Sequence, residues 1–340
     1  MPLQNKYKLS NNDLDSLWRR GCQFLGTKYA ILGGAMSWLS EKNLVSAISE
    51  AGGFGVIACG SMSPDQLALE IRGTSRKTKN PFGVNLILLH PELDALVDTC
   101  IKEEVKFVVL AGGMASRQVI DKLNESQVKV IAFAPTLAVA KKMHRHGVGA
   151  LIIEGMEAGG HIGPVSTNVL AQEILPYIRD IPVFVGGGIG RGEMIASFLA
   201  MGASGCQLGT RFVCAKESIA HKNFKTAFIK ASARDAQVTT QIDPNFPVIP
   251  VRAISNEGTN NFIEAQRAAI TRFRDGKIDQ KTAQLEIEHF WAGALKRAVI
   301  DGDVVNGSLM AGQSVGMVKA EQSVEEIVQE LVEQANMALK

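Results

Sequence analysis

Short apolar runs alternate with amphipathic segments along residues 28–208 of this 340-residue chain. The runs have the length and continuous apolar character of strands that are buried on both faces of a sheet. They cover residues 28–32, 54–58, 82–88, 106–110, 128–133, 150–153, 183–185 and 205–208. Strand–helix alternation predicts a parallel sheet with right-handed crossovers, and eight repeats of roughly 25 residues favour a closed (β/α)8 TIM barrel.

Helices are predicted between these strands. They cover residues 43–51, 64–72, 91–101, 115–123, 137–146, 168–178 and 190–201. Ser40 is expected to cap the first of them and Ser63 the second, because a serine hydroxyl accepts a free backbone N–H at a helix start.

The alternation ends near residue 214, and we expect four parts. These are a helical lead-in (1–26), the barrel (27–214), a helical and loop substrate subdomain over the barrel mouth (215–300), and a C-terminal return segment with a helix packing on the barrel (301–340). The third part holds a proline-rich loop (243–250) and predicted helices over 262–274 and 281–290. Ser323 and Glu326 form a capping box for the last helix, 323–339.

Composition narrows the class of partner. The net charge is +2 and aromatics are 6%, which gives no case for nucleic acid. Five scattered cysteines without a C-x-x-C pair suit a reduced chain rather than a disulfide framework. No apolar run approaches a membrane span or a signal-peptide core. We therefore expect a cytoplasmic protein with no membrane partner.

The strand over 150–153 opens into a loop where chemistry is expected. The loop carries Glu154, Glu157 and His161 among the glycines 155, 159, 160 and 163. Glycines allow a close approach of the backbone to a ligand, and histidine titrates near neutral pH. The carboxyl ends of parallel strands are where α/β barrels place their active sites. His161 is therefore the candidate catalytic residue.

Two further loops follow the last two strands. One contains Gly186, Gly187, Gly188 and Gly190, and the other begins Gln207-Leu208-Gly209-Thr210-Arg211. Backbone N–H groups at such turns and at a helix N-terminus bind phosphate, and the last two loops are the usual phosphate site of a barrel. The alternative is tight helix–strand packing without a ligand.

Sequence motifs argue against several phosphate-containing ligands and leave FMN as the favoured cofactor. No G-x-G-x-x-G opens an early βαβ unit, so a Rossmann dinucleotide site is not expected. Pyridoxal phosphate needs a lysine at a strand end, whereas Lys28 and Lys106 begin strands. FMN is favoured over a phosphorylated substrate, which an isomerase or aldolase barrel would take. Asn85 is a candidate for the flavin edge, and Gly34 and Met36 for the ring face.

The other five histidines are expected to be structural. His90 is predicted to cap a helix, His144 and His146 lie on a predicted exposed basic helix, and His221 and His289 lie in the helical part. No pair has metal-ligand spacing beside carboxylates, so no catalytic metal is predicted.

These motifs resemble those of the nitronate monooxygenase (2-nitropropane dioxygenase) family, and within it the FMN-dependent enoyl-acyl-carrier-protein reductase II branch. Residues 154–161 (EGMEAGGH) and 209–218 (GTRFVCAKES) are characteristic of the family. Residues 81–89 (PFGVNLILL) and 302–313 (GDVVNGSLMAGQ) are closer to the reductase branch. The likeness runs from about residue 27 to the end. Ala35 departs from the Gly-Gly-Met usual after the first strand.

The resemblance implies an FMN-containing barrel with His161 as the active-site histidine. It also implies an NADH or NADPH reductant, and it suggests a monovalent cation and a homodimer. The residues that it places against FMN are Met36, Asn85, Glu154, Gly159, Gly160, Gly187, Gly188, Gln207, Gly209 and Thr210.

Two activities share this cofactor and histidine. One is NAD(P)H-dependent reduction of trans-2-enoyl-acyl-carrier-protein thioesters in fatty acid synthesis, with His161 donating to the developing enolate. The other is oxidation of a small-molecule alkyl nitronate with O2, with His161 orienting the nitronate. The reductase is favoured because the low-aromatic helical part and the proline-rich loop suit an acyl chain.

Overall fold

The computed structural model describes residues 13–243 and 250–340, apart from the side chains at 288, 289 and 292. Its main feature is a parallel sheet of eight strands in the order β1-β9-β8-β6-β5-β4-β3-β2. The two edge strands meet through a parallel bridge between Leu32 and Phe54, which closes the barrel. The predicted TIM barrel is confirmed. The strands are β1 (Ile31–Gly33), β2 (Gly55–Ala58), β3 (Phe82–Ile87), β4 (Phe107–Ala111), β5 (Lys129–Phe133), β6 (Ala150–Glu154), β8 (Val183–Gly186) and β9 (Gly205–Leu208).

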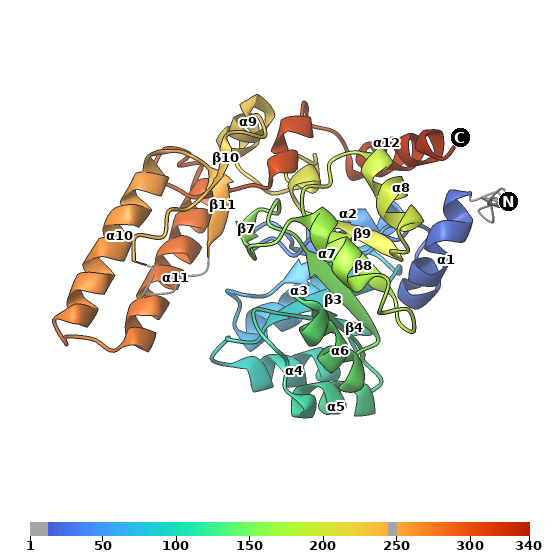
Figure 1. Cartoon of the computed structure of the whole chain (residues 1–340), viewed down its shortest axis with the longest axis horizontal. Coiled ribbons are helices and arrows are strands. Elements are labelled where there is room, and N and C mark those ends of the chain that lie inside the picture. Colours follow the sequence, from blue (N-terminus) through green and yellow to red (C-terminus); the bar gives the residue numbers. More distant parts are fainter. Residues whose placement is uncertain (1–12, 244–249) are drawn as a thin grey trace, which may run out of the picture.

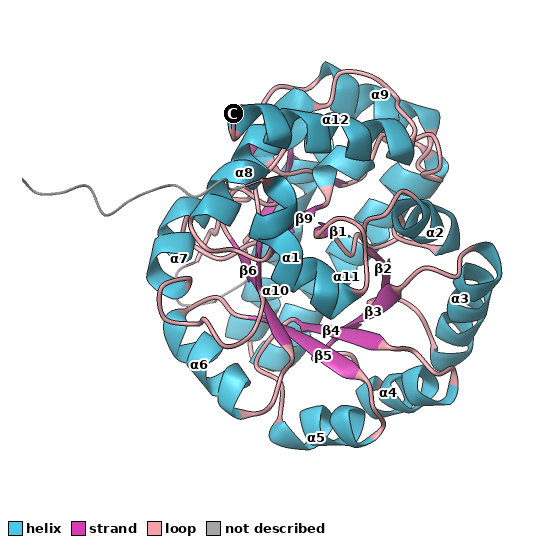
Figure 2. Cartoon of the chain, turned by 90° about the vertical axis from the view of Figure 1, so that its right-hand side faces the viewer, coloured by secondary structure: helices cyan, strands magenta, loops and turns pink. Residues whose placement is uncertain are grey.

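Helices surround the strands (Figure 2). The strand side chains are almost wholly buried, as expected of a barrel covered on its outer face. Every helix predicted between strands is present, with bounds within a few residues. They are α2 (Lys42–Glu50), α3 (Pro64–Lys77), α4 (Leu93–Lys102), α5 (Arg117–Glu125), α6 (Leu137–Arg145), α7 (Thr167–Ile174) and α8 (Gly192–Ala200).

The cap predicted for α2 is wrong by one residue. Glu41 is the N-cap, and its carboxylate accepts the N–H groups of Asn43 and Leu44. The Ser40 hydroxyl instead accepts the Met36 N–H and donates to the Gly34 carbonyl, which holds the loop after β1. The hydroxyl of a serine just before a helix can bond either to the helix N-terminus or to the preceding turn, and the Ser40 hydroxyl bonds to the turn. Ser63 caps α3 with a full capping box, as predicted.

Helix α1 (Leu14–Leu25) covers the amino-terminal end of the barrel. Its apolar face buries Leu14, Trp18 and Leu25. Gly21 permits this approach, because a Cβ there would lie 1.9 Å from the Ser204 carbonyl oxygen. The described part of the predicted lead-in is therefore helical, and residues 1–12 lie outside the described residues.

A second, antiparallel sheet lies beside the barrel mouth and was not predicted. Its strands are β7 (Gly160–His161), β10 (Ala236–Val238), β11 (Val251–Ile254) and β12 (Leu309–Met310). Runs of two to four residues are too short for a periodicity signal, so only their long-range partners define them. β7 belongs to the loop after β6, so this sheet joins the barrel loop to the segment beyond residue 214.

Two helices of that segment form a hairpin to one side of the barrel. Strands β7 and β11 lie between this hairpin and the barrel (Figure 1). The two helices are α10 (Glu257–Arg274) and α11 (Gln280–Lys296), both longer than predicted. Phe262 and Trp291 pack with ring centroids 4.1 Å apart in a small core that Val251 of β11 also enters. The connections also contain helix α9 (Lys222–Lys230), a short π-helix η2 (Arg297–Asp301) and two 3-10 helices, η1 (Thr210–Phe212) and η3 (Gln313–Met317). The predicted proline-rich loop falls largely on 244–249, outside the described residues.

Helix α12 (Val324–Ala338) returns the chain to the barrel and packs on α8. The predicted capping box of Ser323 and Glu326 is present. A Cβ on Gly192 would lie 2.0 Å from the Leu331 carbonyl oxygen, so the two helices touch at their backbones. Among the described residues, no helix is long and apolar enough to cross a membrane.

Candidate functional site

Three strands carry a polar side chain toward their carboxyl ends: Asn85 in β3, Glu154 in β6 and Gln207 in β9. Glu154 is opposite Gly186, which in turn is opposite Gln207. Because Gly186 has no side chain, the Gln207 amide reaches across it and donates to the Glu154 carboxylate at 3.1 Å. On the other side of the barrel, the buried Asn85 amide donates to the Val109 carbonyl at 3.2 Å.

The Glu154 carboxyl is unusual for a strand-end acid. Its surroundings raise its pKa from 4.5 to about 7, chiefly through burial, and the hydrogen bond from Gln207 offsets only part of that rise. The side chain keeps some contact with solvent at the barrel mouth. A carboxyl that is poised near neutrality at a strand end marks a candidate ligand site.

We expect Glu154→Gln to alter how stability depends on pH. Below about pH 4 the carboxyl is protonated in both folded and unfolded chains, so wild type and variant should be alike. As pH rises to about 7, the unfolded chain ionises first, and the wild type should lose at most about 3 kcal/mol relative to the variant. Urea unfolding of FMN-free protein across this range measures the difference. Parallel pH curves for the two proteins would contradict the assignment.

The glycines after β8 have a clear conformational reason. Gly187 and Gly188 have φ of +99° and +70°, which side chains disfavour. A Cβ on Gly187 would lie 2.8 Å from the Thr167 hydroxyl, and one on Gly188 would lie 2.9 Å from the Glu157 Cβ. Both remain partly exposed, so their role as a phosphate cradle stays a prediction.

The next glycines are explained by packing instead. A Cβ on Gly190 would lie 2.4 Å from the Met317 sulfur, and Gly192 touches α12 as described above. The Gly192 N–H at the start of α8 donates to the Gln334 side chain at 2.8 Å. Helix α12 therefore engages one backbone donor at the N-terminus of α8.

The loops after β1 and β9 lie against each other. The Gly34 N–H donates to the Leu208 carbonyl, and a Cβ on Gly34 would lie 3.1 Å from the Gly209 Cα. The Met36 side chain lies over Gly209. The Thr210 hydroxyl accepts the Gly312 N–H at 2.9 Å, so it also holds the C-terminal segment.

The loop that carries His161 is part of the second sheet. His161 pairs with Val251 of β11 and its side chain is exposed, while Gly160, with φ of +76°, pairs with Arg252. A Cβ on Gly159 would lie 2.5 Å from the Gly312 nitrogen. The C-terminal segment therefore approaches the loop at the point where the resemblance places FMN.

Sequence analysis missed three residues that hold this loop. Thr167, at the start of α7, donates its N–H and its hydroxyl to the Glu157 carboxylate at 2.9 and 2.8 Å. Gly312 makes the backbone contact just described. The Arg252 guanidinium donates to the Met156 carbonyl at 3.0 Å. Arg252 did leave a signal, since it is one charge within the apolar run 251–254.

Histidines elsewhere have structural surroundings. His90 and His221 each accept a backbone N–H near a helix start through Nδ1. The Nε2 of His144 lies 3.6 Å from the Asp180 carboxylate. His144 and His146 are half-buried rather than exposed as predicted, because the end of α6 packs on its neighbours. The His289 side chain is outside the described residues.

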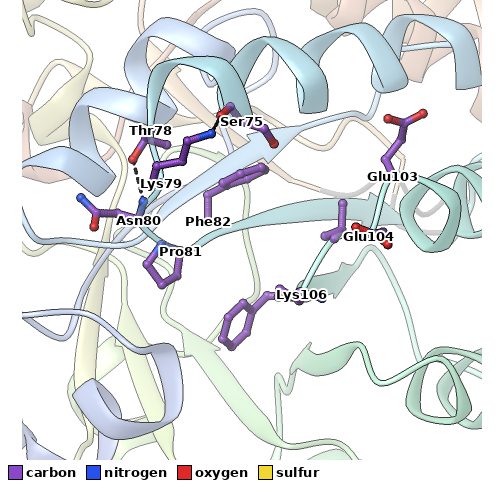
Figure 3. Close-up of a pocket in the computed structure, with 11 residues that line it drawn as sticks. Ser75, Thr78, Lys79, Asn80, Pro81, Phe82, Glu103, Glu104 and Lys106 are labelled. Atoms are coloured by element: carbon purple, nitrogen blue, oxygen red, sulfur yellow. Dashed lines mark hydrogen bonds between the residues drawn. The ribbon is translucent and has the colours of Figure 1, made fainter.

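A cavity of about 330 Å³ lies at the opposite end of the barrel, around the amino-terminal ends of β3 and β4 (Figure 3). Its polar groups are engaged locally: Lys79 donates to the Ser75 carbonyl, and the Asn80 N–H donates to the Thr78 hydroxyl. Because Asn85, Glu154 and Gln207 lie in the carboxyl-terminal halves of their strands, and His161 follows β6, this cavity is not the candidate site.

The nitronate monooxygenase family model matches residues 20–96 and 92–334, which together span most of the chain. The chain belongs to the nitronate monooxygenase family. This member of the family is an FMN-dependent oxidoreductase, and the resemblance seen in its motifs is confirmed.

Individual relatives point to more than one activity within the family. FabK from Thermotoga maritima is 36% identical, with a TM-score of 0.83 and coverage of 94% of this chain and 96% of that one. Nitroalkane oxidase from Streptomyces ansochromogenes is 26% identical, with a TM-score of 0.75 and coverage of 92% and 97%. A curated relative in Rhodococcus jostii, (3aS,4S,5R,7aS)-5-hydroxy-7a-methyl-1-oxo-octahydro-1H-indene-4-carboxyl-CoA dehydrogenase, is 29% identical over 87% of this chain and 89% of its own length.

The residues at the barrel mouth suit FMN. Asn85, Glu154 and Gln207 carry amide and carboxyl groups, which are the kinds of donor and acceptor that the polar edge of a flavin ring can bind. Gly187 and Gly209 leave partly exposed backbone without side chains at the two loops where barrels bind phosphate. The polar group and the glycine loops occupy the same end of the barrel.

Proposed function

We propose that this enzyme reduces trans-2-enoyl thioesters on acyl carrier protein with NADH or NADPH, as a step in fatty acid synthesis. The observation that carries the proposal is the greater likeness to FabK (36% identity, TM-score 0.83) than to nitroalkane oxidase (26%, 0.75). The name of the Rhodococcus relative includes a carboxyl-CoA thioester, which supports a thioester substrate.

FMN, when bound, supplies hydride transfer between the nicotinamide and the β-carbon of the enoyl chain. The chain's own residues would bind and orient it at the barrel mouth. Those proposed to contact it are Gly34, Met36, Asn85, Glu154, Gly159, Gly160, Gly187, Gly188, Gln207, Gly209 and Thr210.

His161 is proposed as the catalytic residue. Its exposed imidazole lies on β7, in the loop that follows the strand bearing Glu154. Reduction at the β-carbon places negative charge on the thioester oxygen, and a donor at that oxygen stabilises the charge and delivers a proton.

Nitronate oxidation is the second candidate. The family model and the nitroalkane oxidase likeness favour it, as do relatives in Staphylococcus aureus named probable nitronate monooxygenase, at 26% identity. In that reaction His161 would orient the nitronate rather than protonate an enolate.

An anaerobic reduction experiment separates the two functions. Purified protein should show a flavin spectrum that bleaches with NADH or NADPH and returns when crotonyl thioester is added. A spectrum that ignores both nicotinamides but bleaches with an alkyl nitronate would overturn the reductase proposal. Comparing crotonyl-acyl carrier protein with crotonyl-CoA tests the carrier preference. By the same resemblance we propose a cytoplasmic homodimer that binds a monovalent cation, testable by sedimentation and by salt-dependent activity.

A further inference from the structure

Arg252 is a buried cation that joins the small sheet to the barrel loop. It lies on β11 and is only 4% exposed. Its Nε donates to the Met156 carbonyl at 3.0 Å, and its Nη1 donates to the Ala236 carbonyl of β10 at 2.7 Å. One guanidinium thus holds two chain segments that lie 80 residues apart in sequence. The planar guanidinium has several N–H donors in a fixed geometry, so it can bind two carbonyls at once. A lysine ammonium is a compact charge on a flexible side chain and cannot hold two carbonyls in the same fixed geometry.

The Met156 carbonyl lies in the loop between Glu154 and His161. At its far end the loop joins the same strand: Arg252 pairs with Gly160, and Val251 pairs with His161. Arg252 therefore contacts the loop twice, through its side chain at Met156 and through its backbone at Gly160. Between these points the Glu157 carboxylate is held by Thr167.

The buried charge has a partner of opposite sign in the same loop. Burial lowers the pKa of Arg252, and the Glu157 carboxylate raises it. Glu157 is the second acid of the EGMEAGGH motif, and the cofactor assignment leaves it without a role. Replacing Arg252 by an uncharged side chain leaves the carbonyls of Met156 and Ala236 without these donors, so the loop is expected to shift.

We propose that Arg252 is a positioning residue for His161: by holding Met156 and Gly160 it fixes where the imidazole lies over the barrel mouth. The inference rests on the catalytic role proposed for His161 and adds a specific requirement for the guanidinium. A displacement of about 1 Å at a catalytic group costs up to 100-fold in rate. Only two of the proposed flavin contacts, Gly159 and Gly160, lie in this loop, so flavin binding should change less than turnover.

A double-mutant cycle tests the proposal in the FMN-loaded enzyme. We would compare Arg252→Met, His161→Ala and the double variant, with Arg252→Lys as the milder change should Arg252→Met fold poorly. The matched control is Lys225→Met. Lys225 is also a nearly buried cation, at 6% exposed, and donates to the Ala215 carbonyl at 2.8 Å, away from the 154–161 loop.

Arg252→Met should lower kcat about 10- to 100-fold with His161 present and less than about 3-fold in the His161→Ala background. KM for the nicotinamide and the bound-flavin spectrum should stay near wild type. Lys225→Met should change kcat by a similar factor in both backgrounds. Equal losses from Arg252→Met in both backgrounds, or an unchanged kcat for Arg252→Met or His161→Ala, would overturn the proposal.

The cycle is independent of which substrate proves correct. It is run with crotonyl thioester if the wild type reduces it, and otherwise with an alkyl nitronate. If the reductase proposal is wrong, wild-type enzyme will not reduce crotonyl thioester. If the positioning proposal is wrong, the effects of Arg252→Met and His161→Ala on kcat will be additive.

Discussion

His161→Ala should lower kcat by about 100- to 10,000-fold, which is the usual contribution of a positioned acid or base. The expectation follows from the place of His161: it is exposed on a two-residue strand, and its backbone is held by Val251. The proposed flavin contacts do not include the His161 side chain, and the change to alanine leaves the backbone of Gly159 and Gly160 unaltered. FMN content, measured from the visible spectrum, should therefore stay near one per chain while steady-state turnover falls.

His90→Ala is the matched control. His90 also follows the carboxyl end of a barrel strand, but its Nδ1 accepts the Glu92 N–H, so the ring has a structural role. This variant should turn over substrate at nearly the wild-type rate. Turnover that survives in His161→Ala, or falls equally in both variants, would remove His161 from the mechanism.

The barrel was predictable because its signals are local. Each strand is an apolar run bounded by glycine or a helix cap, and Ser63 and Ser323 mark helix starts by their own side chains. The small sheet was not predictable, since β7 has two residues and is defined only by its pairing with β11. Ser40 shows the limit of a local rule, because its hydroxyl serves the loop after β1 rather than the helix.

The positions of the candidate site residues in the barrel were more predictable than their contacts. Sequence order alone indicated that Asn85, Glu154 and Gln207 would share one end of the barrel, because parallel strands share a direction. It did not indicate that the Gln207 amide donates to Glu154, because that bond forms only where Gly186, which has no side chain, lies between the two residues. Arg252 was missed for a related reason: its partner Met156 lies far away in sequence.

The second prediction concerns Gly159, the first of the two glycines before His161. Gly159→Ala should destabilise the protein by about 1–3 kcal/mol, because the added Cβ would meet backbone rather than a flexible side chain. The Gly312 nitrogen would be 2.5 Å away and the Ala311 carbonyl carbon 2.6 Å away. The C-terminal segment would have to withdraw, which strains the bond from the Gly312 N–H to Thr210 and the bond from the Gln313 N–H to the Glu157 carbonyl.

Gly163→Ala is the control within the same loop. No atom lies within 4 Å of a Cβ there, so its unfolding free energy should stay within about 0.5 kcal/mol of wild type. Urea unfolding of FMN-free protein separates two roles for Gly159. If the glycine served only the approach of FMN, Gly159→Ala would weaken FMN binding and leave the FMN-free protein as stable as wild type. A loss of stability without FMN instead shows that the motif glycine holds the C-terminal segment, 153 residues further along the chain at Gly312, against the loop that carries His161.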